Sequence, residues 1–287
     1  MIKFNFDKEL TKNFFWKSLQ LLSKQSLILF IFFISAKILN PVDFGLLNYL
    51  LAIVLLLTTF SDFGISTSTS KYVAKYVNID KEKINYVLFS SAFFVFLVGG
   101  ILTLLLVLFS NGRLEYLAYF SPLLFFIPLT SLYDGIYLGL KKFKSSAKIN
   151  FLASFILFII SYFLVINYGL IGSIISYNLF YFLLFLIYLL NEKDLKFTIK
   201  KEIITEIVPY AFIIGFGKLS HFFYTKVDVL ILGMFNFLKQ ISYYEIIFKF
   251  IQTVGLPFWI FSGPLPMPWP VSLCSSSSPL VNLCLSL

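Results

Sequence analysis

The chain has 287 residues, of which 59% are hydrophobic, 20% aromatic and only 13% charged. A soluble domain needs about 25% charged residues to cover its surface, so this composition excludes a soluble globular protein and predicts a polytopic membrane protein. The net charge of +9 is compatible in principle with a nucleic-acid partner. The positions of the lysines argue for membrane topology instead, and we expect no nucleic-acid partner.

The hydrophobic runs predict an all-α fold, a polytopic bundle of membrane helices. Residues 1–17 form a mixed-charge, amphipathic lead-in without the pattern of a cleavable signal. The predicted helices cover residues 18–38, 44–66, 86–109, 115–139, 148–167, 170–190, 207–235 and 241–261. Only Asn167-Tyr168-Gly169 separates the fifth helix from the sixth, which predicts a tight antiparallel turn.

The positive charges lie mainly on one side of this predicted bundle. The lead-in and the connections after the second, fourth and sixth helices carry four lysines each, sixteen in all, and the other side carries only Lys37, Arg113 and Lys239. Cytoplasmic loops are enriched in Lys and Arg, so this asymmetry predicts a cytoplasmic N-terminus. It also predicts short external loops near residues 40, 112, 168 and 238.

One stretch, Ala36 to Tyr76, combines several motifs in a fixed order. A turn contains Pro41, which tends to stop the preceding helix. An apolar run follows, then Asp62-Phe63-Gly64, then a patch of small residues and a basic segment that begins Lys71-Tyr72-Val73-Ala74. This order predicts the exit from one membrane helix, a second membrane helix, and a return to a basic surface loop that contains Lys71 and Lys75.

The ordered set resembles the start of the bacterial polysaccharide flippases, the O-antigen and exopolysaccharide transporters of the multidrug/oligosaccharidyl-lipid/polysaccharide exporter superfamily. The matching pattern is Pro-x-x-Phe-Gly-x-x-x-Tyr over residues 41–49, followed by Asp-x-Gly at 62–64. The resemblance covers about residues 10–261. It implies two six-helix lobes in the bacterial cytoplasmic membrane, which alternate between inward and outward openings and transport a polyprenyl-linked glycan.

A faint internal repeat agrees with two lobes. Lys24 precedes Ile38-Leu39 by 14 residues, as Lys218 precedes Ile231-Leu232 by 13, and Tyr49 and Tyr244 follow the two pairs. Such parallel duplication is common in transporters. We therefore expect four regions: a six-helix lobe at 1–190, a cytoplasmic linker at 191–206, the start of a second lobe at 207–261, and an aberrant tail at 262–287.

The tail departs abruptly from the composition of the rest of the chain. Residues 263–287 contain no Phe, no Ile and no charge, but five of the ten prolines. Prolines at every second position from 264 to 270 prevent a continuous helix. We interpret the tail as a frameshifted or misread end. We expect the chain as given not to transport, because the inner faces of the second lobe, with Lys218 and Asp228, would lack partners.

Ionisable side chains at membrane depth are costly and commonly functional. The proposed substrate-binding residues are Lys24, Lys218 and Lys249, and the proposed sites for a coupling ion or proton are Asp62, Asp134 and Asp228. Structural alternatives remain for the three acids: Asp62 and Asp134 at a membrane interface, or Asp228 in an ion pair with Lys226 or Lys249. A lone His221 cannot build a metal site, and Gly135-x-x-x-Gly139 most simply permits close helix packing.

The predicted function is translocation of a lipid-linked oligosaccharide, with the lipid bilayer and other polysaccharide assembly proteins as partners. The alternatives are a drug or cation antiporter of the same superfamily and a membrane-embedded polysaccharide polymerase. No phosphate-binding glycine loop, HExxH motif or catalytic triad pattern supports an enzyme. Cys274 and Cys284, the only cysteines, support no disulfide framework or metal site, and no cofactor is implied.

Overall fold

The structure is a computed structural model, and it describes residues 8–77, 79, 81–110, 115–191 and 201–262. Helices account for almost all of this part of the chain, as the hydrophobic runs predict. Six stretches of the described residues are long and apolar enough to cross a membrane. They are Lys12–Ile38, Pro41–Tyr76, Lys83–Leu108, Glu115–Gly139, Phe143–Asn191 and Thr205–Met234. The protein is therefore a helical membrane bundle.

The helices follow one another with short connections. They are α1 (Lys8–Ile38), α2 (Pro41–Asp62), α3 (Ile65–Tyr76), α4 (Lys81–Phe109), α5 (Glu115–Ala118), α6 (Leu123–Gly139), α7 (Phe143–Asn191), α8 (Lys201–Met234) and α9 (Leu238–Ser262). The first helix begins ten residues earlier than predicted, so part of the amphipathic lead-in extends it. The last helix, α9, occupies the range predicted for the eighth helix but is not among the six apolar stretches of the described residues.

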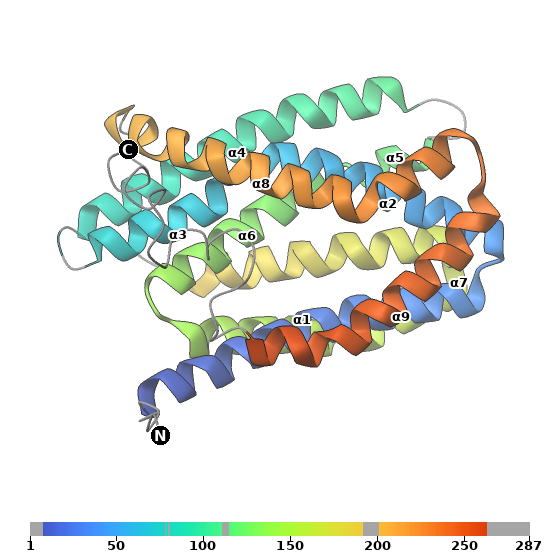
Figure 1. The fold of residues 1–287 in the computed structure, drawn as a ribbon, viewed down its shortest axis with the longest axis horizontal. Helices are drawn as coiled ribbons and strands as arrows, with labels where there is room; N and C mark the ends of the chain where they lie inside the picture. Colours follow the sequence, from blue (N-terminus) through green and yellow to red (C-terminus); the bar gives the residue numbers. More distant parts are fainter. Residues whose placement is uncertain (1–7, 78, 80, 111–114, 192–200, 263–287) are drawn as a thin grey trace, which may run out of the picture.

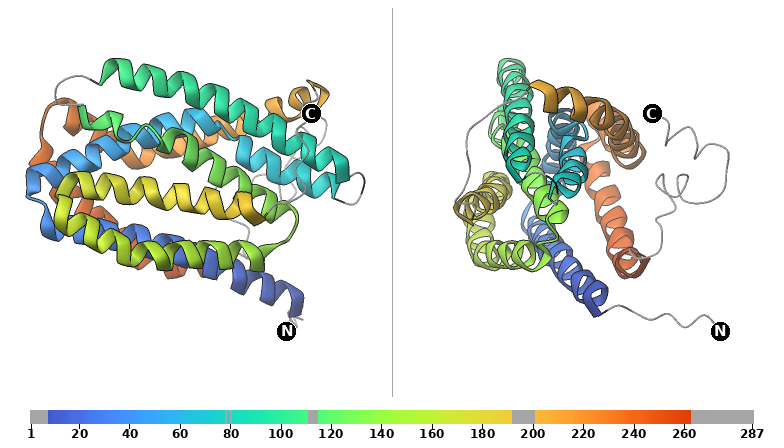
Figure 2. Two further views of the ribbon diagram at one scale, coloured as in Figure 1. Left: turned by 180° about the vertical axis from the view of Figure 1, so that it is seen from behind. Right: turned by 90° about the vertical axis from the view of Figure 1, so that its left-hand side faces the viewer.

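The single label α7 covers two antiparallel legs, which run side by side in Figures 1 and 2. Gly169 joins the legs with φ 52° and ψ −119°, a left-handed backbone conformation that favours glycine. The turn brings the chain so close to itself that a Cβ on Gly172 would lie 1.9 Å from the carbonyl oxygen of Leu164. The predicted tight turn between the fifth and sixth helices is confirmed.

The bundle has a lysine-rich end and a lysine-poor end. In Figure 1 the start of α1, the connection from α3 to α4, the connection from α6 to α7 and the start of α8 all lie toward the left. The turns from α1 to α2, within α7 and from α8 to α9 lie toward the right. Lysines 71, 75, 141, 142 and 144 therefore share one end of the bundle, while Lys37 and Lys239 lie at the other.

The predicted second helix is wrong in one respect, because the basic segment after it is helical and not a loop. α2 ends at Asp62, and the backbone turns through Phe63 (φ 31°) and Gly64 (φ 81°) before α3 begins at Ile65. The N-cap residue of α3 is Gly64, and the Asp62 carboxylate two residues earlier accepts a hydrogen bond from the backbone N–H of Ser66 in the first turn. As a result, Lys71 and Lys75 are helical residues.

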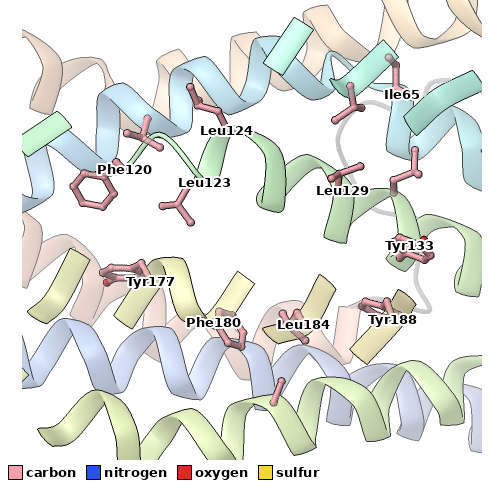
Figure 3. Close-up of a cluster of buried hydrophobic side chains, with 14 of the residues drawn as sticks. Ile65, Phe120, Leu123, Leu124, Leu129, Tyr133, Tyr177, Phe180, Leu184 and Tyr188 are labelled. Atoms are coloured by element: carbon pink, nitrogen blue, oxygen red, sulfur yellow. The ribbon is translucent and has the colours of Figure 1, made fainter. Parts of the chain in front are cut away.

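A main core of apolar side chains fills the space between α1–α7 and includes Ile207 and Ala211 of α8. Figure 3 shows side chains of this core from α3, from the α5–α6 segment and from the second leg of α7. Phe120, Leu132, Phe180, Leu184 and Tyr188 are completely buried. Around the outside, large apolar residues of α4 and of the first leg of α7 are exposed, as expected of helices that face lipid.

Close helix packing depends on glycine where α3 crosses α6. A Cβ on Gly135 would lie 2.4 Å from the carbonyl oxygen of Ser66, and a Cβ on Gly139 would lie 2.7 Å from that of Ser70. These distances leave no room for a side chain. The structure therefore confirms that Gly135-x-x-x-Gly139 permits close helix packing.

Helices α8 and α9 pack against the first part of the bundle. Gly64 and Gly215 allow α8 to approach the bend between α2 and α3, because a Cβ on Gly64 would lie 2.4 Å from the carbonyl oxygen of Ala211. Gly45 allows α2 to approach the start of α9 at Leu238 in the same way. A small second core, which contains Ala52, Val229 and Ile241, lies between α2, α8 and α9.

The chain after α9 lies outside the described residues, and so does the segment 192–200. The interpretation of the tail as aberrant and non-helical therefore stays a prediction, apart from Ser262, which is the last residue of α9. Within the predicted linker, Asn191 ends α7, and residues 201–206 already belong to α8.

Candidate substrate and coupling site

The carboxylate of Asp134 is the centre of a polar cluster between α1, α6 and α7. Its Oδ1 accepts hydrogen bonds from Gln20 Nε2 at 2.7 Å, from the Tyr188 hydroxyl at 2.5 Å and from Ser146 Oγ at 3.3 Å. Asn150 donates to the Tyr188 hydroxyl at 2.9 Å. The cluster joins three helices through one carboxylate. Among the described residues, the buried Oδ1 of Asn150 has no hydrogen-bond partner, so the network is not fully satisfied.

Lys24 completes this cluster with a positive charge. Its ammonium lies 3.6 Å from Asp134 Oδ2 and 5.4 Å from the centre of the Tyr181 ring. The side chains of Lys24 and Asp134 are 23% and 20% exposed, so the ion pair is largely but not fully removed from solvent. A predicted substrate-binding lysine and a predicted coupling acid therefore lie together.

Asp62 and Lys218 form a second ion pair, between the α2–α3 bend and α8. Lys218 Nζ donates to Asp62 Oδ2 and also to Ser66 Oγ at 3.1 Å. Ser66 in turn donates from its backbone and its hydroxyl to the Asp62 carboxylate. The expectation that Lys218 lacks a partner in this chain is wrong, because α8 packs directly against the bend. Asp62 is also buried within the protein rather than exposed at its surface.

A third charged cluster lies between α8 and α9. Lys226 Nζ contacts Glu245 Oε1 at 2.5 Å, and the Glu245 side chain is only 2% exposed. Lys249 is one helical turn beyond Glu245 on α9, and its ammonium lies 5.8 Å from the centre of the Phe32 ring of α1. The sequence points to Lys249 but not to Glu245, whose carboxylate pairs with Lys226 at 2.5 Å.

The third predicted coupling acid, Asp228, does not belong to that cluster. Its carboxylate accepts a hydrogen bond from the Tyr244 hydroxyl at 2.8 Å, at the exposed edge of α8 and α9. The expectation that Asp228 lacks a partner is wrong, and the alternative ion pair with Lys226 is also wrong because Lys226 pairs with Glu245. Asp228 is exposed in this structure, unlike Asp62 and Asp134.

A further set of contacts, between α3 and Glu206 of α8, was not predicted. Glu206 accepts a hydrogen bond from Lys75 at 2.6 Å and another from the Tyr76 hydroxyl, while its backbone carbonyl accepts one from the Tyr72 hydroxyl. Lys71 lies over the Tyr210 ring at 3.6 Å. The spacing of four residues within Lys71-Tyr72-Val73-Ala74-Lys75-Tyr76 signals such a helix face, but only if the segment is recognised as a helix.

These observations define the class of the protein: a bundle of antiparallel membrane helices with lysine–carboxylate pairs inside it. Solved structures of transporters of the MOP superfamily have the same fold. An outward-facing multidrug resistance MATE family transporter aligns with a TM-score of 0.65 at 14% identity over 89% of this chain and 62% of that chain. A transporter from Pyrococcus furiosus aligns with a TM-score of 0.62 at 15% identity, over 82% of this chain and 61% of that chain.

An inward-facing multidrug resistance MATE family transporter aligns with a TM-score of 0.55 at 16% identity, over 76% of this chain and 56% of that chain. The chain therefore spans about three fifths of the length of these structures. No curated protein matches it. The family model of the polysaccharide biosynthesis proteins matches residues 10–257, and the chain belongs to this family.

Proposed function

We propose that the protein moves a lipid-linked oligosaccharide, carried on a polyprenyl diphosphate, across the bacterial cytoplasmic membrane with its N-terminus in the cytoplasm. The observation that carries this proposal is the set of lysines inside the bundle of a polysaccharide biosynthesis family member. Lys24, Lys218 and Lys249 all lie on helix faces between packed helices. Cations held inside a membrane bundle offer an anionic headgroup a path that the bilayer itself does not provide.

Pairing between these lysines and carboxylates supports a coupled mechanism. Lys24 lies beside Asp134, and Lys218 beside Asp62. A diphosphate that attracts a lysine weakens the contact with its carboxylate, and a carboxylate freed in this way can take up a proton or a cation. In this proposal Asp62 and Asp134 serve the coupling ion, whereas Asp228 makes at most a minor contribution because it is exposed.

Complementation tests the proposal. The gene, with the predicted frameshift after residue 261 repaired, is expressed in a bacterial strain that lacks its polysaccharide flippase, and the surface glycan is quantified. We expect the repaired gene to restore the glycan, Lys24→Ala to abolish it, and Lys24→Arg to retain part of it because arginine keeps the charge. Full export by the alanine variant would contradict a role for Lys24 in transport.

A drug or cation antiporter is the second candidate, and the fold shared with multidrug transporters favours it. The same strains distinguish the two functions. An antiporter raises the drug concentration that inhibits growth without changing the surface glycan. A flippase restores the glycan and leaves drug sensitivity unchanged.

A further inference from the structure

Within the part of the chain that the structure describes, three clusters of charge lie inside the bundle, and they differ in their balance of lysines and acids. Lys218 and Asp62 form a one-to-one pair. Lys24 pairs with Asp134, and nearby Lys17 donates instead to Gln20 Oε1 at 2.9 Å, nearer the lysine-rich end of α1. These two clusters therefore have counter-charges or hydrogen bonds for their ammonium groups.

The third cluster has two lysines for one carboxylate. Glu245 accepts a hydrogen bond from Lys226 at 2.5 Å, and Lys249 lies four residues after Glu245 on the same face of α9. Among the described residues, no hydrogen bond or ion pair reaches the Lys249 ammonium, which lies 5.8 Å from the centre of the Phe32 ring. An ammonium group that contacts an aromatic ring but no anion can still bind a negatively charged group.

The position of Lys249 along the membrane strengthens this argument. Lys249 is eleven residues into α9, which begins at the lysine-poor end of the bundle. At 1.5 Å per residue this places it about 16 Å from that end, close to the middle of a hydrocarbon core about 30 Å thick. Among the described residues this charge has no counter-charge in contact, and an anionic ligand would lower the cost of holding it at this depth.

Resting on the proposed function, we infer that Lys249 with Lys226 forms the diphosphate-binding site, and that Glu245 is its built-in counter-ion. With the site empty, Glu245 neutralises Lys226. When a diphosphate enters, Lys249 binds it directly and Lys226 is shared between the diphosphate and Glu245. Competition by Glu245 keeps binding reversible, which a transporter needs in order to release its substrate on the far side.

Calorimetric titration of the purified full chain in lipid nanodiscs, with inorganic pyrophosphate as the probe, tests the inference. Lys249→Gln should weaken binding at least about tenfold, the effect of one lost charge-assisted hydrogen bond. Glu245→Gln should strengthen binding by a similar factor, because both lysines then serve the diphosphate. Lys239→Gln, at the end of the bundle, is the matched control and should bind like the unchanged chain.

A second set of variants separates charge from folding. The double variant Lys226→Gln/Glu245→Gln removes the buried pair together, keeps Lys249, and should still bind pyrophosphate. Thermal unfolding of every variant shows whether it is folded. If Lys249→Gln is folded and binds normally, or if Glu245→Gln binds more weakly despite being folded, the inference is overturned.

The outcomes also separate the inference from the proposed function. Binding that is lost in Lys24→Gln or Lys218→Gln but kept in Lys249→Gln overturns the inference alone. Absence of binding to the unchanged chain overturns both. Farnesyl diphosphate distinguishes a lipid-linked diphosphate from a free one. If it binds more tightly than pyrophosphate, the result supports a lipid-linked substrate. If the two bind equally, the claim of a lipid-linked substrate is overturned.

Discussion

At the scale of single residues, each paired lysine inside the bundle has its charge compensated by one carboxylate. Asp134 compensates Lys24, which links α6 to α1, and Asp62 compensates Lys218, which links the end of α2 to α8. Glu245 compensates Lys226, which links the consecutive helices α9 and α8. Breaking such a pair costs more than the pair itself contributes, because the remaining charge keeps its desolvation penalty without a partner. The pairs therefore restrict which single substitutions the fold tolerates.

The pair of Lys24 and Asp134 gives a stability prediction. Lys24→Ala leaves a largely buried carboxylate without its cation, although Gln20 and Tyr188 still donate to it. We expect a loss of about 1–3 kcal/mol, the cost of an inadequately satisfied buried polar group. Adding Asp134→Asn should recover part of that loss, because the amide carries no charge. Thermal unfolding in detergent measures both variants.

The control for this prediction is Lys148→Ala, a substitution of an exposed lysine near the start of α7. It should leave the unfolding temperature unchanged. An unfolding temperature for Lys24→Ala equal to that of the unchanged protein would show that the pair makes no contribution to stability.

At the scale of helices, glycines set how closely the elements approach. Gly135 and Gly139 bring α6 against the backbone of α3, and Gly64 brings the α2–α3 bend against α8. Without a hydrophobic driving force between helices in lipid, close packing of this kind and interhelical hydrogen bonds hold the bundle together. The ion pair between Asp62 and Lys218 depends on the same close approach.

Gly135→Ala tests this packing. The new Cβ would lie 2.4 Å from the carbonyl oxygen of Ser66, a backbone atom that moves only if α3 moves. We expect destabilisation of about 1–3 kcal/mol, the usual cost of overpacking a tight interface. Gly100→Ala in α4 is the matched control, because a Cβ there would meet no atom within 4 Å and alanine favours a helix. Equal unfolding temperatures for the two variants would contradict the packing argument.

At the scale of the whole molecule, the alternation of helices places most lysines at one end. The start of α1 lies at the same end as the connections after α3 and α6, as Figure 1 shows. This arrangement agrees with the sequence expectation of alternating crossings. Which end faces the cytoplasm is the remaining part of the topology prediction, and the lysine bias argues for the lysine-rich end.

Reporter fusions test that orientation. A fusion at Lys142 should fluoresce as green fluorescent protein and be inactive as alkaline phosphatase, because the predicted topology places Lys142 on the cytoplasmic side. A fusion at Asn111 should give the opposite pair of signals. Identical signals from both sites would refute the alternating topology, and exchanged signals would refute the orientation.

The sequence by itself determined the class of fold, the order of the helices and the family. Apolar runs of about twenty residues report membrane helices directly, because a bilayer excludes unpaired backbone groups. The sequence also identified Lys24, Lys218, Asp62 and Asp134 as unusual, since charge within an apolar run is visible without a structure. The three-residue connection at 167–169 predicted the turn at Gly169, because a connection this short depends only on neighbouring residues and can be recognised in the sequence.

Only the tertiary structure decided which of these charges meet. Lys24 and Asp134 are 110 positions apart, and Lys218 and Asp62 are 156 apart, so no local pattern encodes either pairing. The helical state of α3 also escaped the sequence reasoning, because its small polar residues look like a loop until the Asp62 carboxylate accepts a hydrogen bond from their first turn and α6 packs against them. Glu245 was overlooked for a related reason. A single acid in a mixed helix becomes significant only when Lys226 of α8 is seen to pair with it, with Lys249 one helical turn further along α9.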